Sequence, residues 1–456
     1  MDLNFYHNLK KAVERQCRGD DEKALMMFKV AARRKPDHPI VNMGLGTAYM
    51  NMQMYGHARR HFVKVLEKTG QLPAPFTNLC FVMKHLGEIN GSLKVAQDGL
   101  ELHPEDVALL VNAGSTAYTM GDLDLAADYL ARALERDPES ADALWNLGLV
   151  NLSSGNWDEG WKRYDKGFQA GPRHARPYWD DYPEWIDEPL EGKTILVWGE
   201  QGLGDEIMFA SCLTDLIETK ADVIFECHPR LVPVFKRSFP TITCVGTRKD
   251  RETEWVKQYD IDYQIPLGSL GGAFRLKEND FPADGYLKVD QARVDAYKKE
   301  IGGDFRLGIS WRGGSKNDAS FRRSMTLDEL TDFIPSPWDG LSLVSLQYGD
   351  VGSEIAQHRA LGGEIYHNAY ALEDYDETFH MVAACDLVVS VITTIVHTAG
   401  SIDVPCWCLT PTAPPWKFLP GERMLWHPSV KQYHQKKPYL WDDVLMEVNV
   451  DLEKLK

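Results

Sequence analysis

The chain of 456 residues lacks several features that would assign it to a class at once. It has no apolar run of 18 or more residues, so no segment is predicted to be a transmembrane helix. Its first residues lack a basic stretch followed by an apolar one, and we therefore expect no secretory signal. Eight cysteines are scattered without a C-x-x-C pair, which favours reduced core thiols in a cytoplasmic protein.

A G-x-G-x-x-G fingerprint and a metal-binding motif are also missing, so the sequence predicts neither a dinucleotide cofactor nor a bound metal. The net charge of −17 argues against nucleic acid or an anionic membrane as the main partner. Residues 1–172 hold 20 Lys and Arg against 22 Asp and Glu, whereas the rest of the chain holds 30 against 45. An anionic ligand would therefore need a local basic cluster in the acidic half.

A 34-residue period runs through the first 172 residues. Twelve residues before the end of each period stands a small residue, and eight before it stands, in most repeats, a large apolar one. The periods end at Pro36, Gly70, Pro104, Pro138 and Pro172. A small residue lets two helices approach, a bulky one fills the gap, and a proline ends the second helix. This pattern resembles the tetratricopeptide repeat (TPR) and predicts an α-solenoid of five hairpins over residues 1–172.

Stacked repeats share a core and leave a concave surface. We interpret that surface as a docking groove for a protein or peptide; a structural spacer or a dimerisation element is the alternative. Trp157, Trp161 and Tyr164 predict that the last repeat packs onto the following domain. Residues 173–192 predict an ordered strap instead of a flexible linker, because they combine three prolines with several aromatic residues. These aromatic residues are Tyr178, Trp179, Tyr182 and Trp185.

The periodicity changes at Lys193, where short apolar runs suited to buried parallel strands begin to alternate with helical stretches. Two such series predict two Rossmann-like lobes, residues 193–300 and 301–456, with a cleft between them. The predicted strands are 194–198, 223–226 and 263–266 in the first lobe, and 307–311, 341–346, 387–390 and 405–409 in the second.

Several motifs of this half belong together. They are Trp198-Gly-Glu-Gln-Gly-Leu-Gly-Asp-Glu-Ile-Met-Phe-Ala210, Gly308-Ile-Ser-Trp-Arg312, Arg322-Arg-Ser324, Ser345-Leu-Gln347, Asp386 to Gly400, Pro415-Trp-Lys-Phe-Leu419 and Trp426-His-Pro-Ser429. Over residues 177–435 they resemble TPR-linked bacterial glycosyltransferases related to the lipopolysaccharide heptosyltransferases. The resemblance implies a GT-B fold, with the acceptor in the first lobe and a nucleotide sugar in the second. It also implies an inverting transfer that needs no metal.

The resemblance places the catalytic base at Asp205, which would deprotonate the acceptor hydroxyl. The alternative is that Asp205 only caps the helix that follows. Around it, the acceptor loop would consist of Gln201, Gly202, Gly204 and Glu206.

The leaving diphosphate needs positive charge and backbone N–H donors. A basic cluster lies between Arg306 and Arg323, and from it we predict Arg312 and Lys316 as phosphate contacts; a solvated surface loop is the alternative. Thr393 stands at a predicted helix start, where free N–H groups favour anions. The other predicted donor contacts are Gln347, Thr394, His397 (which matches a histidine of the family), Trp416 and Lys417. The alternative for His397 is a helix histidine whose hydrogen-bond partners lie within the protein. The alternative for Trp416 is a place in an aromatic core.

One position departs from the family. Many relatives have aspartate where this chain has Ile392, and in the heptosyltransferases that aspartate contacts the sugar. Its loss argues against a heptose donor. It also leaves open the alternative that this protein has no catalytic activity.

The leading prediction is an inverting glycosyltransferase whose repeat array presents a protein acceptor, at a Ser or Thr hydroxyl, to the cleft. A second reading keeps the enzyme but gives it a cell-envelope saccharide or lipid as acceptor. A third reading is a non-catalytic scaffold with a degenerate sugar-nucleotide-binding domain. The sequence leaves the oligomeric state, the nucleotide and the sugar open.

Overall fold

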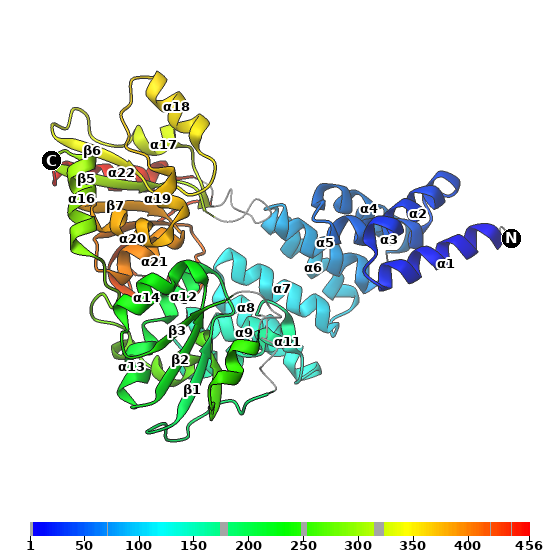
Figure 1. The fold of residues 1–456 in the computed structure, drawn as a ribbon. Coiled ribbons are helices and arrows are strands. Elements are labelled where there is room, and N and C mark those ends of the chain that lie inside the picture. Colours follow the sequence, from blue (N-terminus) through cyan, green and yellow to red (C-terminus); the bar gives the residue numbers. More distant parts are fainter. Residues whose placement is uncertain are drawn as a thin grey trace. The chain divides into compact units, whose positions relative to one another are not determined.

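The first part of the chain folds into helical hairpins that stack one after another (Figure 1). The computed structural model describes residues 3–70, 72–173, 181–247, 253–313, 323–419, 421–438 and 440–456. The first four hairpins are α1 (Leu3–Cys17) with α2 (Asp21–Arg34), α3 (Pro39–Asn51) with α4 (Tyr55–Thr69), α5 (Pro73–His85) with α6 (Ile89–Leu102), and α7 (Val107–Met120) with α8 (Leu123–Arg136).

The 34-residue period accounts for where these helices end. Pro36, Pro104 and Pro138 each stand two residues beyond the end of a second helix. Gly70 directly follows the last residue of α4, and its left-handed φ of 47° ends that helix. The predicted stop positions are therefore confirmed in these repeats.

Close packing of the helices also follows from the period. Gly44 of α3 faces the ring of Phe28, since a Cβ on Gly44 would lie 2.2 Å from a ring carbon. The small residues Ala58 and Ala126 are fully buried. The first helices of successive hairpins lie in contact, α1 with α3, α3 with α5 and α5 with α7, so they form the inner face of the stack. The predicted helical solenoid is confirmed.

The chain divides into two compact units, and the first ends at Val150 while the second begins at Asn151. This boundary lies earlier than residue 172, because the second half of the last hairpin belongs with the α/β part. Trp161 Nε1 donates to the carbonyl of Arg275 at 2.8 Å, and the ring of Trp157 lies 5.0 Å from that of Phe281. The predicted packing of the last repeat onto the following domain is thus present. This hairpin comprises α9 (Ala141–Ser153), α10 (Trp157–Tyr164) and α11 (Gly167–Ala170).

The second unit contains two sheets. In the first sheet the strands lie in the order β3-β2-β1-β4 and all run parallel. The chain moves from β1 to β2 and β3 on one side, then returns to place β4 on the other side of β1. The strands are β1 (Thr194–Trp198), β2 (Asp222–Cys227), β3 (Thr243–Gly246) and β4 (Tyr263–Pro266).

The second sheet has the order β6-β5-β7-β8-β10-β9 and is parallel except for β9. Here the order reverses between β5 and β7. In open α/β sheets, ligands bind beyond the carboxyl ends of strands at such reversal points. The strands are β5 (Phe305–Ser310), β6 (Leu341–Ser345), β7 (Leu387–Val391), β8 (Cys406–Thr410), β9 (Arg423–Met424) and β10 (His427–His434).

Helices connect and cover these strands (Figure 1). In the described ranges, none is long and apolar enough to span a bilayer. The sequence Thr326 to Glu329 forms a capping box at the start of α17, in which Glu329 N–H donates to Thr326 Oγ1 at 3.1 Å. The helices are α12 (Leu203–Phe209), α13 (Cys212–Glu218), α14 (Val232–Ser238), α15 (Gly271–Phe274), α16 (Gln291–Ile301), α17 (Leu327–Thr331), α18 (Gly352–Ala360), α19 (Ala369–Glu373), α20 (Tyr375–Ala383), α21 (Thr394–Ser401) and α22 (Asp442–Glu453), with 3-10 turns η1 (Pro229–Leu231), η2 (Glu254–Gln258), η3 (Leu267–Leu270) and η4 (Glu278–Asp280).

The predicted strap is seen in part, because Tyr178 and Trp179 lie outside the described residues. Its later half extends the edge of the first sheet. Trp185 N–H donates to the carbonyl of Gln264 at 2.9 Å, and Gln264 N–H donates to the carbonyl of Pro183 at 2.8 Å. Trp185 is itself buried. Two sheets of parallel strands joined by helices therefore confirm the predicted α/β architecture, whereas the GT-B type stays a prediction.

Candidate functional site

The loop after β1 is held by a buried carboxylate. Glu206, 1% exposed, accepts the backbone N–H of His228 at 2.8 Å, which ties the loop after β1 to the end of β2. Gly199 leaves room for this carboxylate, since a Cβ there would lie 2.3 Å from Glu206 Oε1. The geometry therefore gives Glu206 the role of fixing the loop around Asp205.

Asp205 stands in the first turn of α12 with its two oxygens engaged differently. Oδ2 accepts the backbone N–H of Gly202, the N-cap, at 3.3 Å, so Asp205 helps to cap α12 from its third position and is not itself the N-cap. Oδ1 forms an ion pair with Lys417, which arrives from the second lobe. The side chains of Asp205 and Lys417 remain 25% and 17% exposed. A carboxylate that is accessible and faces an ammonium group can still meet a ligand, so the base role stays a prediction.

Gly204 lets two helices meet at their N-terminal turns. A Cβ at this position would lie 3.1 Å from His397 Cδ2 and 3.5 Å from the Cα of Thr394. Glycine therefore allows α12, which follows β1 of the first sheet, to approach α21, which follows β7 of the second sheet. This is the point where the predicted acceptor loop and the predicted donor residues come together.

The start of α21 is fixed by two hydroxyls. Thr393 is the N-cap, and its Oγ1 accepts the N–H of Ile395 at 3.1 Å. The same hydroxyl lies 3.1 Å from Ser390 Oγ at the end of β7. Ile392, between them, is 5% exposed and apolar. The N-terminal turn of α21 thus follows a strand at the reversal point of the second sheet, where a helix N-terminus attracts anions.

His397, one turn into α21, pairs with a second histidine. Its Nδ1 lies 3.1 Å from Nε2 of His427, the first residue of β10. Burial, and secondarily the Lys417 charge, lowers the pKa of His397 to about 3, and burial lowers the pKa of His427 well below its usual range. Both rings are therefore neutral at physiological pH.

Lys417 and Trp416 have different environments. Trp416 is 4% exposed and packs in an aromatic core, as its alternative interpretation predicts. Its ring neighbours are Trp161, Tyr164, Phe209 and Trp426. Lys417 instead directs its ammonium group to Asp205. Among the two, Lys417 is the residue available to a ligand.

The loop after β5 is organised by Gln347. Its Oε1 accepts the N–H groups of Trp311 at 2.9 Å and Arg312 at 2.7 Å, and its Nε2 donates to the carbonyl of Arg312 at 3.1 Å. With 2% exposure, the Gln347 amide is occupied within the fold. Contact with a donor stays a prediction for this residue, while its observed contacts shape the loop.

The predicted basic cluster does not come together as one group. Arg306 pairs with Asp386 at 2.9 Å near the start of β5, whereas Arg312 follows the end of that strand. Six residues of extended chain separate them by about 20 Å. Arg312 pairs with Glu354 at 2.9 Å, and Lys316 lies outside the described residues. The prediction that Arg306 belongs to one basic cluster with Arg312 is therefore wrong. Arg306 has a structural role at the opposite end of β5.

Two residues that sequence reasoning missed anchor the predicted acceptor loop. Arg173 and Glu200 form an ion pair at 2.8 Å with both side chains 1% exposed. Gln201 Nε2 donates to Glu200 Oε1 and to the hydroxyl of Tyr164, both at 2.9 Å. Gln201 thus binds the last hairpin through Tyr164. The only sequence signal for Arg173 is its place directly after the last period.

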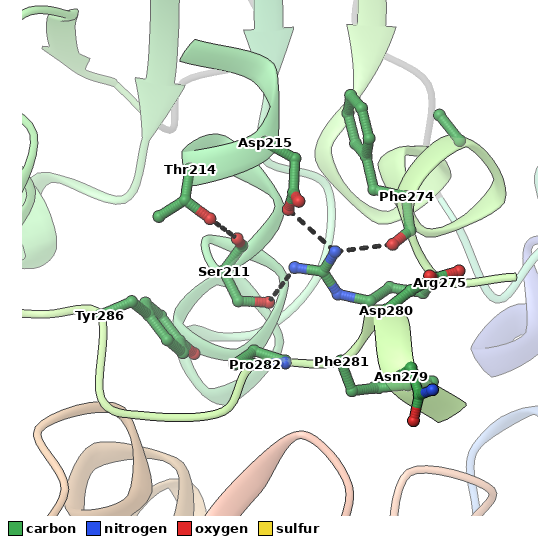
Figure 2. A pocket seen from close by; sticks show the side chains of 11 residues that line it. Ser211, Thr214, Asp215, Phe274, Arg275, Asn279, Asp280, Phe281, Pro282 and Tyr286 are labelled. Atoms are coloured by element: carbon green, nitrogen blue, oxygen red, sulfur yellow. Dashed lines mark hydrogen bonds and ion pairs between the residues drawn. The ribbon is translucent and has the colours of Figure 1, made fainter. Parts of the chain in front are cut away.

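A separate pocket of about 490 Å³ lies between the start of α13 and the segment 273–286 (Figure 2). Arg275, 2% exposed, forms part of its wall and donates to Asp215 at 2.8 Å and Ser211 Oγ at 3.3 Å. Because the Arg275 carbonyl also accepts Trp161 Nε1, this wall belongs to the anchorage of the last hairpin. In the described part of the chain, no group of three His, Cys, Asp or Glu side chains forms a possible metal site.

Comparison with known proteins identifies the first part of the chain. Residues 91–166 match the tetratricopeptide repeat family. Protein FlbA of Caulobacter vibrioides is 26% identical over 96% of this chain and 82% of its own length. TPR repeat-containing protein MJ1428 of Methanocaldococcus jannaschii is 26% identical over 26% of this chain and 21% of its own.

Among solved structures, YrrB, described as a TPR protein with an unusual peptide-binding site, is 25% identical and covers 37% of this chain and 86% of its own, with a TM-score of 0.30. Neither FlbA nor MJ1428 is named as a glycosyltransferase, and that resemblance stays a prediction. The N-terminal part of the chain is an array of tetratricopeptide repeats.

Proposed function

We propose that this protein binds a polypeptide partner along the inner face of its repeat array. The observation that carries the proposal is the tetratricopeptide match over residues 91–166 together with the stacked hairpins. An array of this kind presents one surface from several repeats at once, which suits an extended peptide. The alternative use as a spacer requires no such surface.

Asparagines on the first helices supply suitable chemistry. Asn78, Asn112 and Asn146 recur at the 34-residue period on α5, α7 and α9. An amide side chain carries both a donor and an acceptor, as a peptide unit does, and can bind a backbone of any sequence. Asn112 and Asn146 each use one N–H on their own helix, at 2.9 and 2.7 Å, which leaves the amide oxygen for a partner.

The test replaces all three asparagines by alanine in the full chain. Proteins captured from a lysate are quantified against the unchanged chain and against Asn90→Ala, an exposed asparagine on α6 that serves as a control. A partner retained by the control and lost by the triple variant supports the proposal. Equal capture by all three proteins contradicts it.

For the second unit, we infer binding of a nucleotide sugar at the meeting point of α12 and α21, with transfer of the sugar as the second candidate function. The specific observation in its favour is the convergence of Asp205, Lys417 and His397 at the reversal points of the two sheets. A diphosphate would attract Lys417 and leave Asp205 free. Asp205 would then take the proton of the acceptor hydroxyl while the C–O bond to the sugar forms and the bond to the diphosphate breaks.

A non-catalytic scaffold is the better supported form of the function, since the family match falls on residues 91–166 of the repeats. Ile392 in place of an aspartate also favours it. Thermal-shift measurements with UDP-, GDP-, ADP- and CMP-sugars test ligand binding, and release of free sugar without acceptor tests catalysis. Release that Asp205→Asn abolishes without changing the melting temperature supports a transferase. Stabilisation without release supports the scaffold, and no stabilisation by any compound contradicts nucleotide-sugar binding.

A further inference from the structure

The histidine pair at α21 is enclosed on several sides. His427 is fully buried, and the ring of Tyr286 stacks on it at 6.1 Å between centroids with an interplanar angle of 18°. His397 is 5% exposed, and the ring of Phe418 lies 5.5 Å from its own. These contacts leave each ring little freedom to rotate, so the 3.1 Å contact between them fixes how hydrogen is shared.

Two neutral imidazoles at this distance share one hydrogen, and two arrangements exist. If His397 Nδ1 carried it, His427 would hold its own hydrogen on Nδ1. Among the described residues that nitrogen has no hydrogen-bond partner. It faces Gly400 instead, because a Cβ on Gly400 would lie 2.9 Å from it and a Cα hydrogen occupies that direction. A bare nitrogen suits this position better than a second N–H.

The other side of His397 faces the candidate ligand site. Its Cδ2, the ring carbon bonded to Nε2, lies against Gly204 of α12, and the charge of Lys417 acts on the ring. Nε2 is therefore the nitrogen nearest the junction of α12 and α21. What this nitrogen can offer a ligand depends on the hydrogen arrangement of the pair.

We propose that His427 is a positioning residue that donates its Nε2 hydrogen to His397 Nδ1, so that His397 presents Nε2–H to a phosphoryl oxygen of the ligand. This inference rests on the proposed nucleotide-sugar binding for the identity of the ligand. A neutral N–H donor binds an anion without adding charge, and it cannot act as a base in this form. Lys417 supplies the positive charge that attracts the phosphoryl group, and the N–H of His397 fixes the direction from which its oxygen is bound.

The arrangement can be observed directly in the full chain. Ring ¹⁵N signals of selectively labelled histidines, assigned by loss in His397→Gln and in His427→Gln, distinguish protonated from bare nitrogens. At pH 7.5 we expect His397 to carry its hydrogen on Nε2 and His427 to carry its hydrogen on Nε2. A hydrogen on His397 Nδ1 overturns the proposal, whether or not any nucleotide binds.

Binding measurements test the consequence. UDP, GDP, ADP and CDP are titrated separately by calorimetry, and the nucleotide that binds the unchanged chain is used for the variants. His427→Leu removes the donor and is expected to weaken binding about tenfold, as for loss of one hydrogen bond to a charged group. His427→Gln keeps an N–H donor and is expected to retain affinity within about threefold.

His380→Leu is the matched control, because His380 is equally buried but has a different hydrogen-bond partner. It lies on α20, and its Nε2 accepts the N–H of Asp290 at 3.0 Å. It should leave nucleotide affinity unchanged. Equal weakening by His380→Leu and His427→Leu would reduce His427 to a packing role and contradict the proposal. Failure of all four nucleotides to bind contradicts the proposed ligand, while the ring signals still decide the hydrogen arrangement.

Discussion

Arg173 Nη2 lies 2.8 Å from Glu200 Oε1, and solvent reaches only 1% of either side chain. Arg173 also pairs with Asp165 and lies over the rings of Tyr164 and Phe168, at 4.5 and 4.1 Å. One guanidinium therefore joins the last hairpin to the loop that follows β1. The position of that loop depends on the repeat next to it.

Replacing Arg173 by methionine should destabilise the second unit strongly. The change leaves Glu200 as a buried charge without its cation, and such a loss costs about 3–5 kcal/mol. Urea unfolding followed by tryptophan fluorescence reports on this unit, because 12 of the 13 tryptophans follow Asn151.

The control is the exposed pair of Lys193 with Asp262, at the same distance of 2.8 Å but with side chains 46% and 35% exposed. Lys193→Met should cost less than about 1 kcal/mol. Similar losses for both variants would show that burial does not govern the Arg173 pair.

The array offers two glycines with opposite expected effects. Gly44→Ala would place a Cβ 2.2 Å from the ring of Phe28, which should cost about 1–3 kcal/mol through overpacking. Gly56 in α4 has open space around it, so Gly56→Ala should add about 0.5–1 kcal/mol by reducing the freedom of the unfolded chain. Hydrogen exchange of peptides covering α2 to α4 measures both, and faster exchange in Gly56→Ala would contradict the second expectation.

The repeat array could be predicted closely because its structure is local. The small residue, the bulky residue and the stop of each hairpin lie within twelve positions of one another, and the period repeats that information several times. Strands β1 and β4 could be predicted equally well, since a short apolar run that ends in a glycine or proline turn has few alternatives to a buried strand. The helical pattern of the sequence runs through residues 206–219 as one stretch, and nothing in its composition predicts the break between α12 and α13 near Ser211.

The site residues that sequence reasoning missed depend on contacts between distant segments. His427 stands 30 residues from His397, and Arg173 stands 27 residues from Glu200; neither spacing has a local signature. Arg306 shows the reverse error, since proximity in sequence to Arg312 gave the appearance of a cluster that an extended strand separates. The motifs indicated which loops follow β1 and β5. The ion-pair and hydrogen-bond partners of the residues in these loops could be assigned only from the folded structure.

Trp161→Phe should loosen the attachment of the last hairpin. The change leaves the carbonyl of Arg275 without the 2.8 Å hydrogen bond from the indole, at a cost of about 1–3 kcal/mol for a buried unsatisfied group. Limited proteolysis should then cleave near α10 and α11 earlier than in the unchanged protein. Trp407→Phe, at a half-buried position of β8, serves as the control, and equal cleavage in both variants would contradict the anchoring role.

The buried histidines predict a loss of stability in mild acid. Burial lowers the pKa of His397 to about 3 and that of His427 well below its usual range, while both titrate near 6.5 in the unfolded chain. Below pH 6.5 the unfolded state therefore binds protons that the folded state does not. The free energy of unfolding should be fully retained above pH 6.5 and should fall between pH 6.5 and 5, by about 1.4 kcal/mol per pH unit for each ring.

His427→Gln isolates one of these contributions. As the pH decreases from 6.5 to 5, the free energy of unfolding of this variant should fall less steeply than that of the unchanged chain. The two slopes should differ by about 1.4 kcal/mol per pH unit, because glutamine does not titrate. Depressed carboxylates such as Asp451, whose pKa is lowered chiefly by Lys431, lose their contribution only below the ordinary aspartate value of 3.8, outside this window. Urea unfolding at pH 7.5, 6.0 and 5.0 gives both slopes, and identical slopes would mean that His427 is already protonated in the folded protein.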